Sequence, residues 1–143
     1  MAIKQIEYGS KEYKKMVDLR YEILRKPLGQ TFTESHLAKD KDAILIGVFD
    51  EDEILACCVL SPIGNDTLRL RQMAVQKNLQ GKGIGESIMN FAENLARDKG
   101  YKLLMMHARD SAIRFYEKFG YQIKGDQFIE LETPHHIMEK QLM

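Results

Sequence analysis

A glycine-rich segment, Gln80-Gly81-Lys82-Gly83-Ile84-Gly85, constrains the fold of this chain more than any other feature of the sequence. It follows a strand-like apolar run at residues 68–75 and precedes an amphipathic helical pattern at residues 84–99. The first N–H groups of a helix have no partner inside the helix, and the helix dipole adds partial positive charge there. The sequence therefore predicts a strand–turn–helix unit whose helix start binds a phosphate or pyrophosphate group.

Two common nucleotide-binding motifs do not fit this segment. A dinucleotide-binding fingerprint has a third glycine where this chain has Glu86. A P-loop needs Ser or Thr directly after Gly-Lys, and Gly83 stands there instead. The alternative is that the glycines serve only tight packing at the start of a helix. Three glycines within five residues, between a strand and a helix, favour the phosphate site.

The remaining pattern predicts one domain over residues 1–143, of the α/β (α+β) class, with a mixed central β-sheet flanked by helices. Strands are expected at residues 3–8, 43–49, 54–60, 67–75, 102–108, 121–124 and 136–142. Helices are expected at residues 11–24, 84–99 and 111–119, with a short one after Thr33. Simple alternation along the central strand predicts one shared face for Leu68, Leu70, Gln72 and Ala74.

Composition excludes several classes of protein. Lys and Arg number 21 and so do Asp and Glu, and this zero net charge argues against a general nucleic-acid binder. No apolar run is long enough to span a membrane. Adjacent Cys57 and Cys58 should point to opposite faces of a strand, so no disulfide is expected and a reducing cytoplasm is favoured. His135-His136 has no evident third ligand, and no metal site is expected.

Two further segments carry recognisable patterns on either side of the glycine turn. They are Leu70-Arg71-Gln72-Met73-Ala74-Val75 and Ser111-Ala112-Ile113-Arg114-Phe115-Tyr116-Glu117-Lys118-Phe119-Gly120-Tyr121. Together with Gln80, Gly83 and Gly85, they resemble the signatures of the GNAT family, the Gcn5-related N-acetyltransferases: L-x-x-(M/L)-A-V, Gln/Arg-x-x-Gly-x-Gly/Ala and A-x-x-F-Y-x-x-x-G-F. The resemblance covers roughly the central half of the chain. It implies the GNAT acyl-CoA N-acyltransferase fold.

Two outer segments add a weaker resemblance. The segment Leu19-Arg20-Tyr21-Glu22-Ile23-Leu24-Arg25-Lys26-Pro27-Leu28-Gly29 and the ending Pro134-His135-His136-x-Met138 look like those of small bacterial-type, single-domain GNAT proteins. Dimerisation is common in the family, so a homodimer is a further expectation, although no segment of the sequence identifies an interface.

The resemblance implies acetyl-CoA as the cosubstrate, with no metal. The pyrophosphate would be held by the main-chain amides of Gln80, Gly81, Lys82, Gly83, Ile84 and Gly85. Glu86 completes the set of residues expected to bind the cosubstrate. Main-chain groups of Met73, Ala74 and Val75 would pair with the pantetheine arm as if it were an added strand. The amide of Ala74 or Val75 would also hold the thioester oxygen as charge develops on it.

The resemblance also places Tyr116 at the family's usual acid position. A phenol with a pKa of about 10 can give a proton to a departing thiolate, whose thiol has a pKa of about 8.5. The competing interpretation is that Tyr116 is a core residue like its neighbours Phe115 and Phe119. On the family match, we expect Tyr116 to be catalytic.

The general base stays open at this point. His107 ends the strand that should lie beside the cosubstrate, so it is a candidate base, with a structural role as the alternative. Glu34 and His36 lie in the segment where this family usually builds its acceptor site. A placed water is the remaining alternative. Similarly, Arg20, Arg25 and Arg69 either bind an anionic substrate group or form surface ion pairs.

These observations predict an N-acetyltransferase that moves an acetyl group from acetyl-CoA to a primary amine of an unidentified small-molecule or peptide acceptor. Direct attack in a ternary complex is expected, because neither cysteine has an evident activating partner for a covalent intermediate. The first alternative is a non-catalytic acyl-CoA-binding or regulatory domain. The second is a domain that binds another phosphate ligand, such as a nucleotide.

Overall fold

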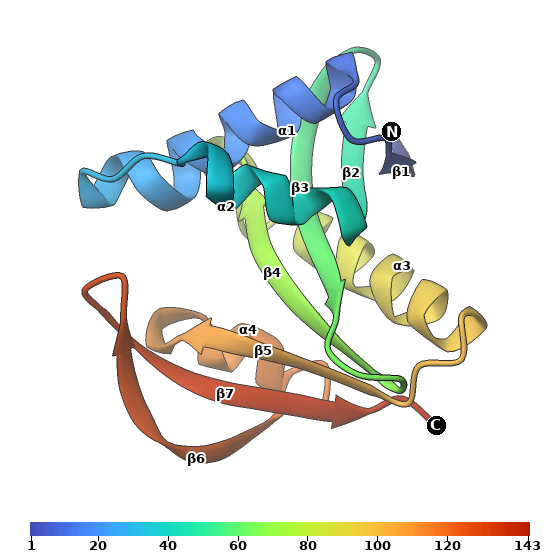
Figure 1. The fold of residues 1–143 in the computed structure, drawn as a ribbon, viewed down its shortest axis with the longest axis vertical. Helices are drawn as coiled ribbons and strands as arrows, with labels where there is room; N and C mark the ends of the chain where they lie inside the picture. The colour runs from blue at the N-terminus through green and yellow to red at the C-terminus, as the bar shows by residue number, and fades with distance from the viewer.

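The computed structural model describes all 143 residues. Seven strands form one sheet in the order β1-β2-β3-β4-β5-β7-β6 (Figure 1). The strands are β1 Ala2–Ile6, β2 Ile44–Asp50, β3 Glu53–Pro62, β4 Thr67–Val75, β5 Leu103–Arg109, β6 Gln122–Glu130 and β7 Thr133–Gln141. All neighbours are antiparallel except β4 and β5, which run parallel. The predicted mixed sheet flanked by helices is confirmed.

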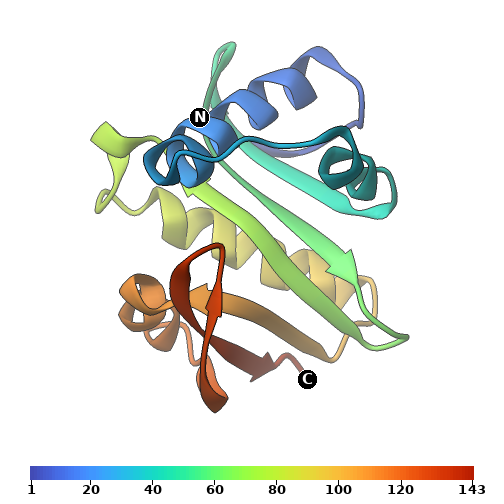
Figure 2. The same ribbon diagram turned by 60° about the vertical axis from the view of Figure 1, so that its left-hand side comes forward.

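The helices lie on both faces of the sheet. They are α1 Lys11–Arg20, α2 Glu34–Ala38, α3 Ile84–Asp98 and α4 Ile113–Glu117. Figures 1 and 2 show α1 and α2 on one side of the sheet and α3 on the other. None of these helices combines the length with the apolar composition needed to cross a bilayer.

Two hydrophobic cores result, one on each face. Cys58 belongs to the core under α3 and Cys57 to the core under α1, because successive side chains of a strand point to opposite faces. Both cysteines are buried and unlinked, as predicted. The apolar stripe of α3 fills the first core, while Met16 and Leu19 of α1 reach the second.

The first helix departs from the regular form at its end. Ser10 caps it, with its Oγ accepting from the Tyr13 N–H at 3.1 Å. The α-helical hydrogen bonding ends at Arg20, and residues 21–25 form a π-helical turn in which the Lys26 N–H donates to the Tyr21 carbonyl. The predicted range of residues 11–24 is therefore helical, but its last turn is wider than an α-helix. Such turns occur frequently at functional sites.

A β-bulge in β4 overturns one expectation. Arg71 pairs with Val59 but Ala74 pairs with Cys57, so one residue of β3 stands opposite two of β4. Gln72 has a φ of +55° at this point. The extra residue reverses the alternation, and Ala74 joins the core under α1 while Leu68 and Leu70 lie in the core under α3. The predicted shared face of Leu68, Leu70, Gln72 and Ala74 is therefore wrong beyond Leu70.

The parallel strands β4 and β5 separate beyond the middle of the sheet. Their pairing stops at Leu70 opposite Met106, although β4 continues to Val75 and β5 to Arg109. The separated edges carry main-chain groups with no neighbouring strand on that side. The fold thus opens an unpaired edge of β4 next to the start of α3.

The C-terminal hairpin is longer than predicted. Strands expected at residues 121–124 and 136–142 are Gln122–Glu130 and Thr133–Gln141, joined by Leu131 and Glu132. Both turn residues have positive φ, +52° and +62°, as a type I′ turn requires, without the Gly or Asn that would signal it. The hairpin tip points toward the turns after α1, where Gln30 Nε2 donates to the Leu131 carbonyl at 3.5 Å (Figure 1).

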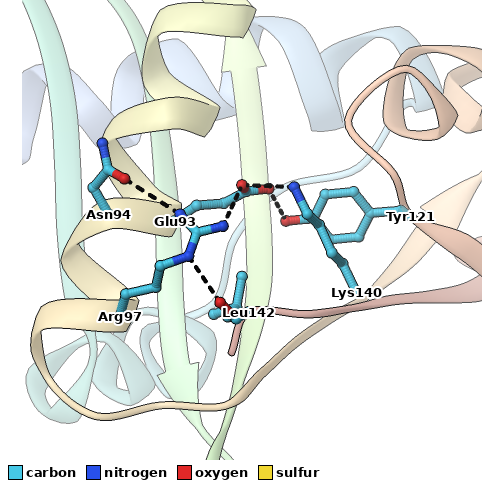
Figure 3. Close-up of polar contacts among 6 residues, drawn as sticks. All are labelled: Glu93, Asn94, Arg97, Tyr121, Lys140 and Leu142. Atoms are coloured by element: carbon cyan, nitrogen blue, oxygen red, sulfur yellow. Dashed lines mark hydrogen bonds and ion pairs between the residues drawn. The ribbon is translucent and has the colours of Figure 1, made fainter.

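A buried carboxylate joins α3 to the end of the sheet (Figure 3). Glu93 accepts hydrogen bonds from the Tyr121 hydroxyl at 2.7 Å, from Lys140 Nζ at 2.9 Å and from Arg97 Nη2 at 3.5 Å. Arg97 also donates through Nε to the Leu142 carbonyl at 2.9 Å. Burial, and then the hydrogen bond to Glu93, raise the pKa of Tyr121. We refer to Glu93, Arg97, Tyr121 and Lys140 as the Glu93 network.

Candidate active site

A cleft of about 550 Å³ opens where β4 and β5 separate. Its walls are the edges of the two strands, the glycine turn, α4, the π-helical turn and the tip of the β6–β7 hairpin. The predicted residues that line it are Met73, Ala74, Val75, Gln80, Gly81, Gly83, Gly85, Glu86, His107 and Tyr116. The structure thus brings most of the predicted site residues to one cavity.

The glycine turn presents a row of N–H groups. Gly81 and Gly83 have φ of +80° and +85°, a conformation that glycine adopts without strain. No side chain caps α3, and none of the hydrogen bonds of loops, turns and caps is donated by the N–H groups of residues 81–86. These N–H groups, together with the positive end of the helix dipole, are available to hydrogen-bond an anion, as the sequence predicts.

Neighbouring contacts fix the position of this turn. Gln80 Nε2 donates to the Val75 carbonyl at 3.2 Å, which ties the turn to the end of β4. A Cβ at Gly85 would lie 3.0 Å from the Phe115 ring, so a glycine lets α4 pack against the start of α3. The remaining two predicted residues do not line the cleft with their side chains, since that of Lys82 is exposed and that of Ile84 is buried in the core.

Tyr116 reaches the cleft from α4 while most of its side chain is buried. The residue is 7% exposed, and its ring lies edge-on to that of Phe115 with centroids 5.1 Å apart. Burial raises the pKa of the phenol, and the neighbouring Cys58 adds to the effect. Tyr116 is therefore protonated at neutral pH. Tyr116 packs in the core and also lines the cavity. Its environment therefore fits both the predicted catalytic residue and the alternative of a core residue.

His107 forms a polar group with two partners. Its Nδ1 lies 2.9 Å from Glu130 Oε2 and 3.0 Å from Arg69 Nη2. Burial raises the pKa of Glu130, but the hydrogen bond and charge of His107 and the charge of Arg69 outweigh it, so the pKa lies below its ordinary value. Glu130 is thus ionised at neutral pH.

Sequence reasoning missed Glu130. This residue ends β6 and reaches the cleft only because the hairpin extends to residue 133. A type I′ turn built from Leu131 and Glu132 gives no glycine signal in the sequence.

The other two candidate bases lie elsewhere. His36 accepts through Nδ1 from the Thr33 N–H at 3.4 Å, and its own N–H donates to Thr33 Oγ1 at 3.2 Å, which forms a capping box at α2. Neither Glu34 nor His36 lines the cleft. The side chain of His36 is thus engaged in capping its own helix.

The adjacent histidines of β7 diverge, as expected. His136 Nδ1 lies 2.7 Å from Asp110 Oδ1, whereas His135 is buried, lines the cleft and contacts the Thr133 carbonyl through Nδ1 at 2.7 Å. No three His, Cys, Asp or Glu side chains gather in a way that could hold a metal ion.

Arginines are concentrated in the same cavity. Arg25, Arg69, Arg71 and Arg109 all line it, and Arg71 and Arg109 were not singled out from the sequence. Arg20 is different, because it is fully buried in an ion pair with Asp40 at 2.9 Å. The Tyr13 hydroxyl donates to the same carboxylate oxygen at 2.6 Å. Arg20 therefore belongs to the packing of α1.

Comparison with known proteins identifies the family and the fold of the chain. A family model described as the acetyltransferase (GNAT) family matches residues 10–121. The uncharacterized protein YyaT of Bacillus subtilis is 32% identical over 76 residues, 53% of this chain and 51% of YyaT. The "Probable N-acetyltransferase 14" of Xenopus tropicalis is 27% identical over 115 residues, 77% of this chain and 55% of that protein. The chain thus spans about half the length of these relatives.

Solved structures share the whole fold. A "putative N-acetyltransferase from Lactobacillus plantarum" superposes with a TM-score of 0.87 at 23% identity, covering 100% of both chains. An aminoglycoside 6'-N-acetyltransferase complexed with coenzyme A superposes with a TM-score of 0.81 at 17% identity, covering 100% of this chain and 98% of that one. At such identities, the similarity establishes the fold of the chain.

Proposed function

The chain belongs to the GNAT acetyltransferase family, and on this premise we propose that it transfers an acetyl group from acetyl-CoA to the primary amine of an acceptor. The observation that carries the proposal is the cleft, which joins the free N–H groups of the glycine turn to the unpaired edge of β4, Tyr116 and His107. A neighbour of the same fold has coenzyme A bound, which supports a cosubstrate of this kind.

On the donor side, the glycine turn would bind the diphosphate through the N–H groups of residues 81–86. Between Arg71 and Val75, β4 has no strand beside it on the cleft side, so its main chain is free to pair with the amide groups of an extended arm. An N–H group of Ala74 or Val75 would stabilise the negative charge that develops on the thioester oxygen.

The transfer needs two proton movements besides the attack itself. The amine nitrogen forms a bond to the thioester carbon, the carbon–sulfur bond breaks, and the sulfur leaves with the bonding electron pair. Tyr116, protonated and inside the cleft, would give that sulfur its proton. The proton lost by the amine would pass to His107 or to a water next to it. No step uses Cys57 or Cys58, which are buried and have raised pKa values because of that burial.

His107 fits the base role in one of its two tautomers. If Nδ1–H donates to the ionised Glu130 at 2.9 Å, Nε2 keeps its lone pair and can accept a proton. Arg69 can only donate, so its contact with Nδ1 at 3.0 Å competes with this arrangement. In the other tautomer, the lone pair of Nδ1 would face the Glu130 carboxylate, so that two acceptors would oppose each other. We therefore assign the tautomer with the proton on Nδ1 to the active form.

A thermal-shift comparison tests the donor. Saturating acetyl-CoA at about 100 times its dissociation constant should stabilise the protein by about 2.7 kcal/mol and raise the melting temperature by roughly 5–10 °C. ATP and NAD at equal concentration should leave the melting temperature unchanged. Stabilisation by ATP or NAD without stabilisation by acetyl-CoA would contradict the proposal.

Two tyrosine variants test the acid. Tyr116→Phe should lower the rate of CoA release with an amine acceptor by about 10²-fold or more, because the proton donor is lost, while acetyl-CoA binding changes little. Tyr121→Phe removes a hydroxyl from the same motif outside the cleft and serves as the matched control. Equal turnover in Tyr116→Phe and wild type would remove Tyr116 as the acid. Acetyl-CoA binding without CoA release on a broad amine panel would instead favour a non-catalytic binding domain.

A further inference from the structure

The walls of the cleft carry an excess of positive charge in a chain that is neutral overall. The charged residues lining it are Arg25, Arg69, Arg71, Arg109, Lys118, Glu86 and Glu130. Five of these seven are cations, whereas the whole chain has 21 of each sign. We name Arg25, Arg71 and Arg109 the arginine cluster. They come from the π-helical turn, from β4 and from the end of β5.

No member of the arginine cluster has a carboxylate partner. None of the ion pairs in the structure involves Arg25, Arg71 or Arg109. Arg71 Nη1 donates to Ser61 Oγ at 3.0 Å, and Arg109 Nη2 donates to the Leu24 carbonyl at 3.1 Å. These neutral acceptors hold the side chains in place, and no carboxylate lies within ion-pair distance of them.

Arg25 is the most buried member of the cluster. It is 8% exposed, lies over the Phe32 ring at 4.6 Å from its centroid, and makes one long contact of 3.5 Å with the Leu24 carbonyl. Burial, and then the charges of Arg109, Arg20 and Arg71, lower the pKa of Arg25. Such a buried and unpaired guanidinium is costly unless an anion approaches it.

Further polar atoms around the same cavity lack partners. Arg69 Nε, Gln72 Oε1 and Gln30 Oε1 are buried without a hydrogen bond. Arg69 and Gln72 line the cleft, and Gln30 lies beside the hairpin tip. Arg69 also contacts His107 and lies 4.0 Å from Glu130. Polar groups without a full set of partners therefore extend from the arginine cluster to Arg69, which contacts the side chain proposed to take the proton of the amine.

We propose that the acceptor is a small primary amine that also carries an anionic group, a carboxylate or a phosphate, and that Arg25, Arg71 and Arg109 bind that group. This inference rests on the proposed function of the same cleft. Arg guanidinium groups bind both kinds of oxyanion through paired N–H donors. The same charges repel polyamines and other acceptors whose only charges are positive.

Binding to the CoA-loaded protein tests this without any turnover. Two matched pairs of probes are titrated by calorimetry: phenylalanine against phenethylamine, and glucosamine 6-phosphate against glucosamine. The anionic member of at least one pair should bind about tenfold tighter or more, and the pair that shows the difference identifies carboxylate or phosphate. Equal binding of the two members of both pairs, or no binding by any probe, would overturn the proposal.

Charge-removing variants locate the effect. Arg25→Gln, Arg71→Gln and Arg109→Gln should each lose about tenfold or more of the preference for the anionic probe, since a hydrogen bond to a charged group contributes about 1.5–3 kcal/mol. The exposed Arg114→Gln on α4, outside the cleft, should keep the preference. A preference that survives in all three cluster variants would overturn the assignment of these residues.

The affinity for acetyl-CoA separates this inference from the proposed function. If the cluster variants bind acetyl-CoA as wild type does, the arginines act on the acceptor, as proposed. If the variants lose acetyl-CoA binding and the anionic preference together, the cluster binds the cosubstrate, and the inference fails while acetyl transfer stands. If wild type binds no acetyl-CoA, the proposed function itself fails.

Discussion

The buried Glu93 carboxylate accepts hydrogen bonds from two cations and a hydroxyl, whereas the three cations of the arginine cluster have no carboxylate at ion-pair distance. Glu93 accepts from Tyr121, Lys140 and Arg97 at 2.7, 2.9 and 3.5 Å. Arg25, Arg71 and Arg109 take part in no ion pair. Each group contains one buried charge, Glu93 or Arg25, among half-buried ones, so the two groups differ mainly in their partners.

The contrast separates a stabilising role from a binding role. A buried charge with a full set of hydrogen-bonding partners holds elements together, and its loss leaves the partners unpaired. A partly buried charge without an opposite charge does little for the free protein, and it is kept available for a ligand. The Glu93 network ties α3 to β7 in the free protein, whereas on our proposal the arginine cluster gains its partner when the acceptor binds.

The largest expected effect is at Glu93. Glu93→Ala should lower the free energy of unfolding by about 3 kcal/mol, because Lys140 and the Tyr121 hydroxyl lose their acceptor. The melting temperature should fall by roughly 6–12 °C, and urea denaturation gives the free energy directly. Acetyl-CoA binding by the folded protein should be unchanged, since Glu93 does not line the cleft. A loss below about 1 kcal/mol would remove the contrast between the two regions.

The arginine cluster should respond with the opposite sign. Arg71→Met in the free protein should leave the free energy of unfolding within about 0.5 kcal/mol of wild type or raise it, because it removes a partly buried cation whose loss is offset by packing. Burial, above all, lowers the pKa of Arg71, so its charged form is disfavoured in the fold. Urea denaturation measures the change. Destabilisation by more than about 1 kcal/mol would show that Arg71 holds the fold together.

A smaller effect on the free energy of unfolding is expected at Glu130, which forms ion pairs and also lines the cleft. Its pKa is below the ordinary value in the folded protein, so the unfolded chain binds its proton more readily. Its contribution to stability is thus present above the unfolded pKa of about 4.3 and is lost as pH falls through the lower folded value. Glu130→Gln should therefore be less stable than wild type at pH 7, and the difference should shrink as pH falls below about 4.3 and through the folded pKa. A constant difference across that range would contradict the assignment.

The smallest effect is expected at the two buried cysteines, which carry no charge and should not react in the folded protein. Burial raises the pKa of Cys57 to about 12 and raises that of Cys58 as well. Because the thiolate is the reactive form, neither residue should react with a thiol reagent at pH 8 until the protein unfolds. Labelling in urea should report two thiols per chain. Rapid labelling of the native protein would show that the sheet opens locally between β3 and its neighbours.

Local patterns in the sequence were sufficient to predict the part of the cleft around the glycine turn. The glycine turn, the strand before it and the helix after it all depend on contacts between residues close in the chain, and they lie where they were predicted. Tyr116 was also correctly predicted near the cavity, because α4 follows β5 after one short 3-10 turn and packs on Gly85 through Phe115. Their binding and catalytic roles stay predictions.

The part of the cleft around His107, Glu130 and the arginine cluster depends on irregularities that leave no pattern in the sequence. The bulge at Gln72 changes the face of every later residue in β4, although no glycine marks it. Glu130 is brought to His107 by a hairpin whose turn lacks the usual residues. In the sequence, Arg71 and Arg109 cannot be told from ordinary exposed cations of a strand. Only the structure shows that they line the same cavity as Arg25.

The π-helical turn at residues 21–25 allows the position of Arg25 to change without a change in the sheet. Each residue of an α-helix advances the chain by about 100° around the axis, so deleting one residue from this turn would restore a regular helix and swing Arg25 away from the cleft. A substitution would have to repack the neighbouring Phe32, whereas a deletion moves the whole guanidinium at once. On the proposed function, a change of acceptor is therefore accessible to this fold through a change in chain length, with the glycine turn and the edge of β4 left intact.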